Sequence, residues 1–164
     1  MPSATTVVVT GGAGFIGSHV VDRLLDNDYQ VTVIDDLSSG KPENLPEGVE
    51  LIAADITSDV AADAIKVVAP ELIVHAAAQI SVSLSTREPL LDARINVLGT
   101  VNVLEAARVS GTQKFVFFSS GGTVYGQPDD LPVSESYPTG PENPYGASKL
   151  TGELYLDMYR RTYG

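Results

Sequence analysis

Tyr145 and Lys149 are the pair of side chains in this sequence with the clearest capacity for chemistry. They lie four residues apart in a segment predicted to be helical, so both project from one face of the helix. A free tyrosine has a pKa of about 10, which is too high for a base at neutral pH. A nearby ammonium lowers that pKa by stabilising the phenolate, so such a pair can take and return a proton near neutrality. The alternative interpretation is a surface tyrosine and lysine at ordinary helical spacing.

The rest of the chain predicts the elements that must position this pair. Strand-like and helix-like segments alternate, which favours a Rossmann-like, doubly wound parallel sheet in a three-layer α/β/α arrangement. Strands are predicted at 5–10, 30–35, 49–53, 71–75 and 114–118, and helices at 15–26, 58–69, 90–110 and 144–163. We expect residues 1–164 to form one dinucleotide-binding domain.

The segment from Thr10 to His19 has the glycine spacing of a dinucleotide-binding turn. Glycines 12, 14 and 17 fit G-x-G-x-x-G, and glycines 11, 14 and 17 fit the wider G-x-x-G-x-x-G. Such glycines permit a tight turn, close approach of a pyrophosphate, and close packing of helix against strand. The helix N-terminus then offers free N–H groups to the phosphates. A ligand-free strand-to-helix turn is the alternative.

Polar or small residues follow each predicted strand at its carboxyl end, where doubly wound sheets bind ligands. Asp35 is placed to hydrogen-bond the adenosine ribose and to repel a 2′-phosphate, which predicts NAD rather than NADP. Asp55, Ala76–Gln79 and Ser119–Thr123 follow three other strands. A turn-forming role for Asp55 and close packing at Ala76–Gln79 remain open.

Composition narrows the classes of function. The formal net charge of −11 opposes binding to nucleic acid and to an anionic membrane surface. The absence of cysteine excludes disulfides, thiolate nucleophiles and thiolate metal sites. No long apolar run or secretory leader is visible, so a cytoplasmic location is the default expectation. His19 and His75 have no partner at ligand spacing, and no metal site is predicted.

As a set, these motifs resemble those of the extended short-chain dehydrogenase/reductases and, within them, the nucleotide-sugar epimerase/dehydratases. The matching segments are Thr10–Gly17, Asp35, Asn96, Ser119–Gly126 and Tyr145–Lys149. The resemblance covers essentially the whole chain.

The resemblance implies that NAD stays bound while Tyr145 takes a proton from the C4 hydroxyl of a UDP-sugar. Hydride passes to the nicotinamide and returns to the other face of the 4-keto intermediate, and Lys149 holds the nicotinamide ribose. It also implies a homodimer through the helices at 90–110 and 144–163. The positions that would line the cofactor are Gly11, Gly14, Phe15, Ile16, Gly17, Asp35, Asp36, Ser38, Ser39, Gly40, Asp55, Ile56, Ala76, Ala77, Ala78, Gln79, Asn96, Ser119, Tyr145 and Lys149.

One departure from the family pattern concerns the reacting hydroxyl. Members of the family usually carry Ser or Thr three residues before the Val of Val-Tyr-Gly, and Gly121 stands there in this chain. Ser120 and Thr123 are the two candidates for a replacement hydroxyl.

A second departure concerns length, because members of the family are roughly twice as long. A substrate-binding domain is therefore expected to be absent from residues 1–164, and Phe115–Phe118 are expected to lie on an edge strand. Two alternative functions stay open: a non-catalytic NAD-binding module, and a related NAD-dependent dehydratase or reductase. Gly122 and Thr123 stand where such dehydratases carry an acidic pair, which disfavours that class.

Overall fold

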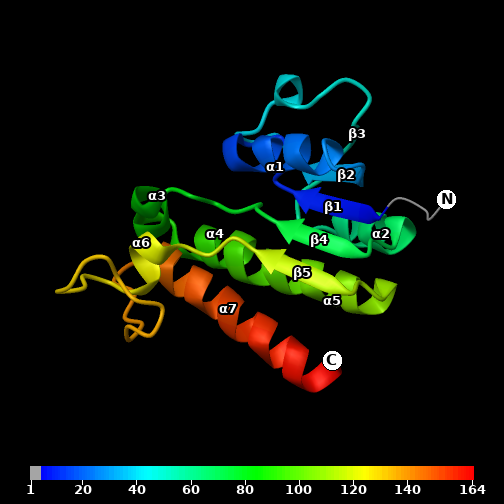
Figure 1. The fold of residues 1–164 in the computed structure, drawn as a ribbon. Coiled ribbons are helices and arrows are strands. Elements are labelled where there is room, and N and C mark those ends of the chain that lie inside the picture. Colours follow the sequence, from blue (N-terminus) through cyan, green and yellow to red (C-terminus); the bar gives the residue numbers. More distant parts are fainter. Residues whose placement is uncertain (1–4) are drawn as a thin grey trace. The chain divides into compact units, whose positions relative to one another are not determined.

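The computed structural model describes residues 5–164 (Figure 1). The chain divides into two compact units, each of which is discontinuous in sequence. The sheet unit comprises the residues through Ala78 together with Gly99–Phe118, and the helical unit comprises Gln79–Leu98 and Ser119–Gly164. Because the chain passes between them three times, neither unit corresponds to one continuous stretch of sequence.

The sheet unit contains a five-stranded parallel sheet in the order β3-β2-β1-β4-β5. This topology confirms the predicted Rossmann-like α/β fold. The strands are β1 (Thr6–Thr10), β2 (Gln30–Asp35), β3 (Glu50–Ala53), β4 (Leu72–His75) and β5 (Lys114–Phe117). Each lies within one residue of its predicted bounds, because buried runs of β-branched residues such as Val7–Val9 mark central strands clearly.

Helices cover both faces of this sheet. Figure 1 shows α1 (Phe15–Leu25) on one face, and α2 (Asp59–Val68) and α5 (Thr100–Ser110) on the other. A short 3₁₀ helix, Pro42–Asn44, lies in the loop before β3. Valines of β1, β2, β4 and α1 form the core between α1 and the sheet, and they are Val7, Val9, Val21, Val31, Val33 and Val74.

The ends of α2 follow ordinary capping rules with one exception. The Ser58 side chain accepts a hydrogen bond from the Ala61 N–H at the N-terminus, as expected for this residue type. At the C-terminus Ala69 adopts a left-handed conformation with φ 46° and ψ 58°, which strains a residue that has a Cβ.

Replacing Ala69 with glycine should therefore stabilise the protein. We expect the Ala69→Gly variant to raise the free energy of unfolding by about 0.5 kcal/mol, since relief of strain exceeds the added unfolded-state entropy. Denaturant unfolding measures the difference. Ala62→Gly, inside the same helix, is the control and should destabilise by about 1 kcal/mol. A loss of stability in Ala69→Gly would contradict the expectation.

The helical unit contains three short helices, one π-helical segment and one long helix. These are α3 (Val82–Arg87), α4 (Pro89–Asp92), η2 (Ala93–Gly99, whose last residue belongs to the sheet unit), α6 (Gly121–Val124) and α7 (Pro144–Tyr163). Helix α7 has its predicted bounds, because Asn143 caps it through the Gly146 N–H at 2.8 Å and Pro144 occupies its first turn.

The segment predicted as one helix over 90–110 is helical throughout, but it is not α-helical throughout. The structure places α4, η2 and α5 in succession, with a π-helical segment at Ala93–Gly99. The wider turn shifts the side-chain phase, so Leu98 is 62% exposed although α-helical spacing placed it on the core face. Helices α3 and α6 were not predicted, because each is only four to six residues long.

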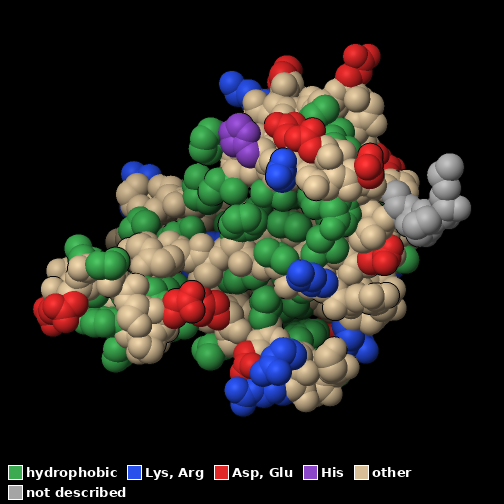
Figure 2. Space-filling view, in the orientation of Figure 1, with side chains coloured by type: hydrophobic (Ala, Val, Ile, Leu, Met, Phe, Trp, Pro, Cys, Tyr) green, Lys and Arg blue, Asp and Glu red, His purple; other side chains and the backbone are tan. Residues whose placement is uncertain are grey.

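Strand β5 lies at the edge of the sheet, as expected for residues 115–118. An apolar groove adjoins it, lined by α1 side chains that include Phe15 and Ile16 and by Phe118. Figure 2 shows hydrophobic side chains gathered over this face of the sheet unit. Among residues 5–164, no helix has the length and apolar character needed to cross a membrane.

Candidate functional site

The turn between β1 and α1 is built so tightly that only glycine fits at several of its positions. Gly11 has φ +70°, and a Cβ there would lie 2.6 Å from the Ala77 backbone nitrogen. A Cβ at Gly17 would lie 2.0 Å from the Gly11 carbonyl oxygen, and at Gly14 a Cβ would lie 3.3 Å from the same oxygen. The structure thus explains the 11, 14, 17 pattern as a compact loop whose backbone can be approached closely.

The N-terminus of α1 is open to an anion. Gly14 is its N-cap, no side chain caps this end, and the first turn holds no acidic residue. Phe15 and Ile16 begin the helix and are 80% and 56% exposed. Uncapped N–H groups at a helix N-terminus attract phosphate, so this end of α1 fits the pyrophosphate of a dinucleotide.

Asp35 ends β2 and holds this loop in shape. Its two carboxylate oxygens accept hydrogen bonds from the Ala13 N–H at 3.0 Å and the Leu37 N–H at 2.9 Å, and the residue is 5% exposed. Gly40 packs against the same carboxylate, where a Cβ would lie 2.9 Å from Oδ1. The side chain therefore supports the loop as well as presenting a negative charge at the end of β2.

The neighbouring polar residues of the sheet unit form hydrogen bonds mostly within local turns. Asp36 is exposed and accepts hydrogen bonds from the Ser38 backbone N–H and hydroxyl, while Ser39 is exposed beside them. Asp55 accepts a hydrogen bond from the Thr57 N–H at 2.8 Å, which is the turn-forming interpretation, and it stays partly exposed. Ile56 is buried against Gly99.

Residues 76–78 follow β4 and are half-buried. Ala76 and Ala77 donate their N–H groups to Thr10, at 3.0 Å to the carbonyl and 3.4 Å to the hydroxyl. His75 is fully buried and hydrogen-bonded to the hydroxyls of Thr10 at 2.6 Å and Thr100 at 3.1 Å. This histidine is a satisfied core residue, as the sequence favoured.

The helical unit brings together the candidate reactive residues of α6 and α7. Tyr145 lies in the first turn of α7, and its hydroxyl is hydrogen-bonded to the Ser120 side chain, which lowers the tyrosine pKa. Thr123 instead turns its hydroxyl to the Ser120 carbonyl at 3.4 Å. Of the two candidates for the hydroxyl missing at Gly121, Ser120 is therefore the one that bonds Tyr145. Ser119 is hydrogen-bonded to the Glu153 carboxylate.

Burial dominates the electrostatics of the pair. Burial raises the pKa of Tyr145 above its usual value of 10, against the effect of Ser120, and the Asp92 carboxylate raises it further. Burial also lowers the pKa of Lys149 to about 8, and the Asp92 carboxylate opposes this. The Lys149 ammonium lies 5.9 Å from the centre of the Tyr145 ring. The Tyr–Lys spacing predicted a lowered tyrosine pKa. In the protein chain by itself burial raises this pKa instead.

Asn96 and Gln79 form a hydrogen-bonded unit next to this pair. The Asn96 amide accepts from the Gln79 N–H at 2.8 Å and donates to the Gln79 carbonyl at 2.9 Å and to Ser148 Oγ at 3.3 Å. Asn96 is 2% exposed. Ser85 accepts a hydrogen bond from the Tyr145 N–H at 3.2 Å. Ser85, Asp92 and Ser148 were missed from the sequence, because nothing in their spacing links them to Tyr145.

Comparison with known proteins identifies the family of this chain. The model of the NAD dependent epimerase/dehydratase family matches residues 7–164. The UDP-glucose 4-epimerase of Mycolicibacterium smegmatis is 49% identical over 161 residues, covering 95% of this chain and 51% of that protein.

Solved structures agree with the sequence comparison. The UDP-glucose 4-epimerase of Thermus thermophilus in complex with NAD has a TM-score of 0.94 at 44% identity, covering 98% of this chain and 52% of that chain. The Thermotoga maritima enzyme with UDP-glucose has a TM-score of 0.92 at 42% identity, with the same coverage. The chain spans about half the length of these relatives. It belongs to the NAD dependent epimerase/dehydratase family.

Proposed function

We propose that this chain is the NAD-binding and proton-transferring half of a UDP-glucose 4-epimerase type enzyme. The observation that carries the proposal is the Tyr145–Lys149 pair of α7, in which the buried Lys149 ammonium lies 5.9 Å from the centre of the Tyr145 ring, in a chain whose β1–α1 turn accepts only glycine at its closest contacts. The family and the related structures, one in complex with NAD and one with UDP-glucose, support the cofactor and the substrate class.

In the proposed reaction, three residues of the chain have separate roles. Tyr145, as phenolate, takes the proton of the sugar C4 hydroxyl, and Ser120 donates a hydrogen bond that steadies the reacting oxygens. Lys149 stabilises the phenolate by its charge. Bound NAD would supply the acceptor and donor of the C4 hydride and a positive charge that favours the phenolate. Tyr145 then returns the proton to the sugar oxygen.

Conversion of UDP-galactose to UDP-glucose by the complete gene product tests the reaction. NAD binding is tested separately on residues 1–164 by fluorescence of NADH and by thermal shift with NAD. Conversion of UDP-galactose would support the proposed reaction. A protein that binds neither NAD nor NADP would refute the proposal, because the reaction begins with NAD binding.

A non-catalytic NAD-binding module is the second candidate. The observation that favours it is Gly121, which stands where members of the family usually carry the Ser or Thr that bonds the reacting hydroxyl. NAD binding without conversion of UDP-galactose by the complete gene product would favour this candidate.

We also propose that the chain forms homodimers through the helices at 90–110 and 144–163. The described residues support this with exposed apolar side chains on both segments: Leu90 and Leu98 on the first, Leu154 and Met158 on the second. Sedimentation velocity across a concentration series tests the proposal, and a monomer at all concentrations would reject it.

Asp35 should set both loop stability and cofactor preference. In Asp35→Asn one of the two backbone N–H groups that the carboxylate binds loses its acceptor. We expect a loss of about 1–2 kcal/mol in the free energy of unfolding and a weaker preference for NAD over NADP. Thermal melts and titrations with both nucleotides measure these effects. Asp129→Asn, at an exposed carboxylate outside the predicted cofactor positions, is the control and should change neither.

A further inference from the structure

Asp92 is an almost fully buried carboxylate that the proposed reaction does not use. It is the last residue of α4 and is 1% exposed. Isolated buried carboxylates are costly, so one that is retained is normally balanced by hydrogen bonds or by an opposite charge. Both kinds of partner are present in the helical unit.

Hydrogen bonds tie Asp92 to the unit formed by Asn96 and Gln79. Asp92 Oδ1 accepts from Asn96 Nδ2 and from Gln79 Nε2, each at 2.9 Å. Asn96 Nδ2 also lies 3.3 Å from Ser148 Oγ on α7, next to Lys149 in sequence. Asp92 is thereby connected to the helical turn that presents Tyr145 and Lys149.

The opposite charge is Lys149, which is 4% exposed. Asp92 is the carboxylate that opposes the effect of burial on the lysine pKa. Helices α3, α4 and α6 contact α7. The ionisable side chains of α3 and α4 are Arg87, which is exposed, and Asp92, and α6 has none. On α7 itself, Tyr145 and Glu153 stand four residues from Lys149 on either side.

We propose that Asp92 is a positioning residue for the Tyr145–Lys149 pair: its buried carboxylate is the counter-charge of the buried Lys149 ammonium, and through Asn96 it orients the turn that carries both residues. Asp92 does not touch the reacting atoms in this assignment. It acts on the reaction through Lys149, so the inference rests on the proposed function only where a reaction rate is measured.

The titration of Lys149 tests the counter-charge directly. The chain has four lysines, Lys41, Lys66, Lys114 and Lys149, so NMR of protein labelled at lysine Cε gives few resonances to assign. The isosteric Asp92→Asn variant keeps an oxygen for hydrogen bonding and removes the charge. We expect the Lys149 pKa, which is about 8 with Asp92 in place, to fall. An unchanged Lys149 titration would overturn the proposal.

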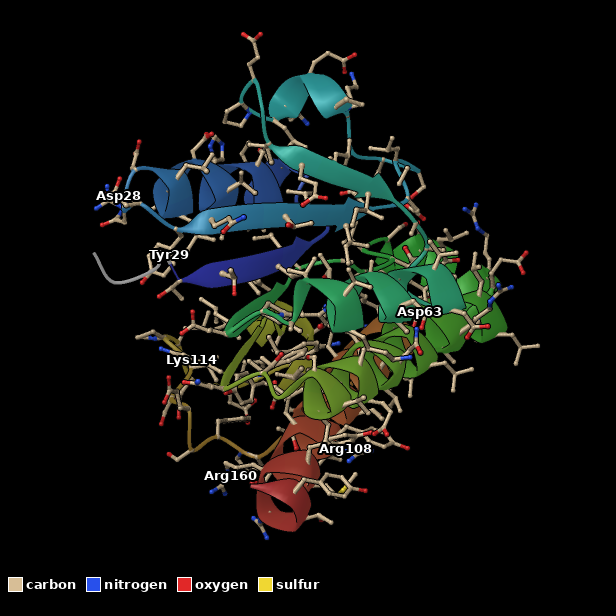
Figure 3. All side chains as sticks on the ribbon, turned by 90° about the vertical axis from the view of Figure 1, so that its right-hand side faces the viewer. Asp28, Tyr29, Asp63, Arg108, Lys114 and Arg160 are labelled. Atoms are coloured by element: carbon tan, nitrogen blue, oxygen red, sulfur yellow. The ribbon has the colours of Figure 1, made fainter. Side chains whose placement is uncertain are left out.

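Asp63→Asn is the matched control. Figure 3 labels Asp63 on α2, and its carboxylate pairs with Lys66 at 2.9 Å with 70% of the Asp63 side chain exposed. Removing this exposed charge should leave the Lys149 resonance unmoved. Lys66 in turn should be unaffected by Asp92→Asn.

A double variant covers the possibility that Asp92→Asn does not fold. Replacing Lys149 as well, in Asp92→Asn/Lys149→Met, leaves neither charge buried without its partner, and we expect folding to be restored. A double variant no better folded than Asp92→Asn would overturn the counter-charge assignment.

The pH dependence of the rate of UDP-galactose conversion by the complete gene product is a further test. A purely structural role of Asp92 would not change this pH dependence. If Lys149 must be charged, the rate falls as pH rises through its pKa, and Asp92→Asn moves this fall to lower pH by the same amount as the NMR titration. A shifted titration without any conversion would reject the proposed function and keep the role of Asp92. A rate profile that does not follow the titration would reject the link between the two.

Discussion

The Gly17→Ala variant should lose NAD binding almost completely and lose much of its stability. The added methyl group would lie 2.0 Å from the Gly11 carbonyl oxygen and 2.8 Å from the Gly12 Cα, and both neighbours are backbone atoms that cannot rotate away. Gly11 is itself held at φ +70°. The start of α1 must therefore move away from β1, which destroys the cradle for the pyrophosphate.

We expect the affinity for NAD to fall by about 100-fold or more, and the free energy of unfolding to fall by about 3 kcal/mol. Fluorescence titration with NADH and denaturant unfolding of residues 1–164 measure these two quantities. Gly14→Ala should have a smaller effect, because its Cβ would lie 3.3 Å from the same oxygen.

Gly140→Ala is the matched control for this prediction. A Cβ at Gly140 meets no atom within 4 Å, so the substitution should leave both quantities nearly unchanged. Equal effects of Gly17→Ala and Gly140→Ala would show that the tight turn is not the cofactor cradle.

The second large effect is expected at Tyr145. Replacing it with phenylalanine removes the hydroxyl that binds Ser120 and that would carry the proton, while the ring that lies 5.9 Å from the Lys149 ammonium is kept. We expect kcat for UDP-galactose conversion by the complete gene product to fall about 10²–10⁴-fold, with little change in the affinity for NAD. Steady-state kinetics and NADH titration separate the two.

Tyr155→Phe is the matched control, because it removes a hydroxyl from the same helix about 15 Å further along its axis. It should leave kcat within about twofold of the unaltered protein. Activity of Tyr145→Phe at the level of this control would assign the proton transfer to another group.

Much of the sheet unit could be predicted from local sequence. The central strands β1 and β2 are buried and rich in β-branched residues, and the turn after β1 has the glycine pattern that close backbone approach demands. These signals are local because a strand's burial and a turn's backbone angles act on neighbouring residues. The ends of α7 were equally predictable, since Asn143 and Pro144 mark its start.

The segment from 89 to 110 shows where local pattern was insufficient. Its apolar spacing predicts an α-helix throughout, but the structure inserts the π-helical segment Ala93–Gly99. Within it Asn96 is buried and hydrogen-bonds Asp92 and the backbone of Gln79. These tertiary hydrogen bonds offset the cost of the widened turn, and no periodicity in the sequence encodes them.

The sequence by itself determined the family and the parallel sheet, and it predicted the glycine turn and the Tyr145–Lys149 pair as the candidate site, because each depends on residue types at fixed short spacing. Only the tertiary structure showed that Thr123 turns its hydroxyl to the Ser120 carbonyl, and that Asp92 is buried and hydrogen-bonded to Asn96. The physical reason is that hydrogen bonds and buried charges act over a few ångströms in space, whatever the separation of the residues along the chain.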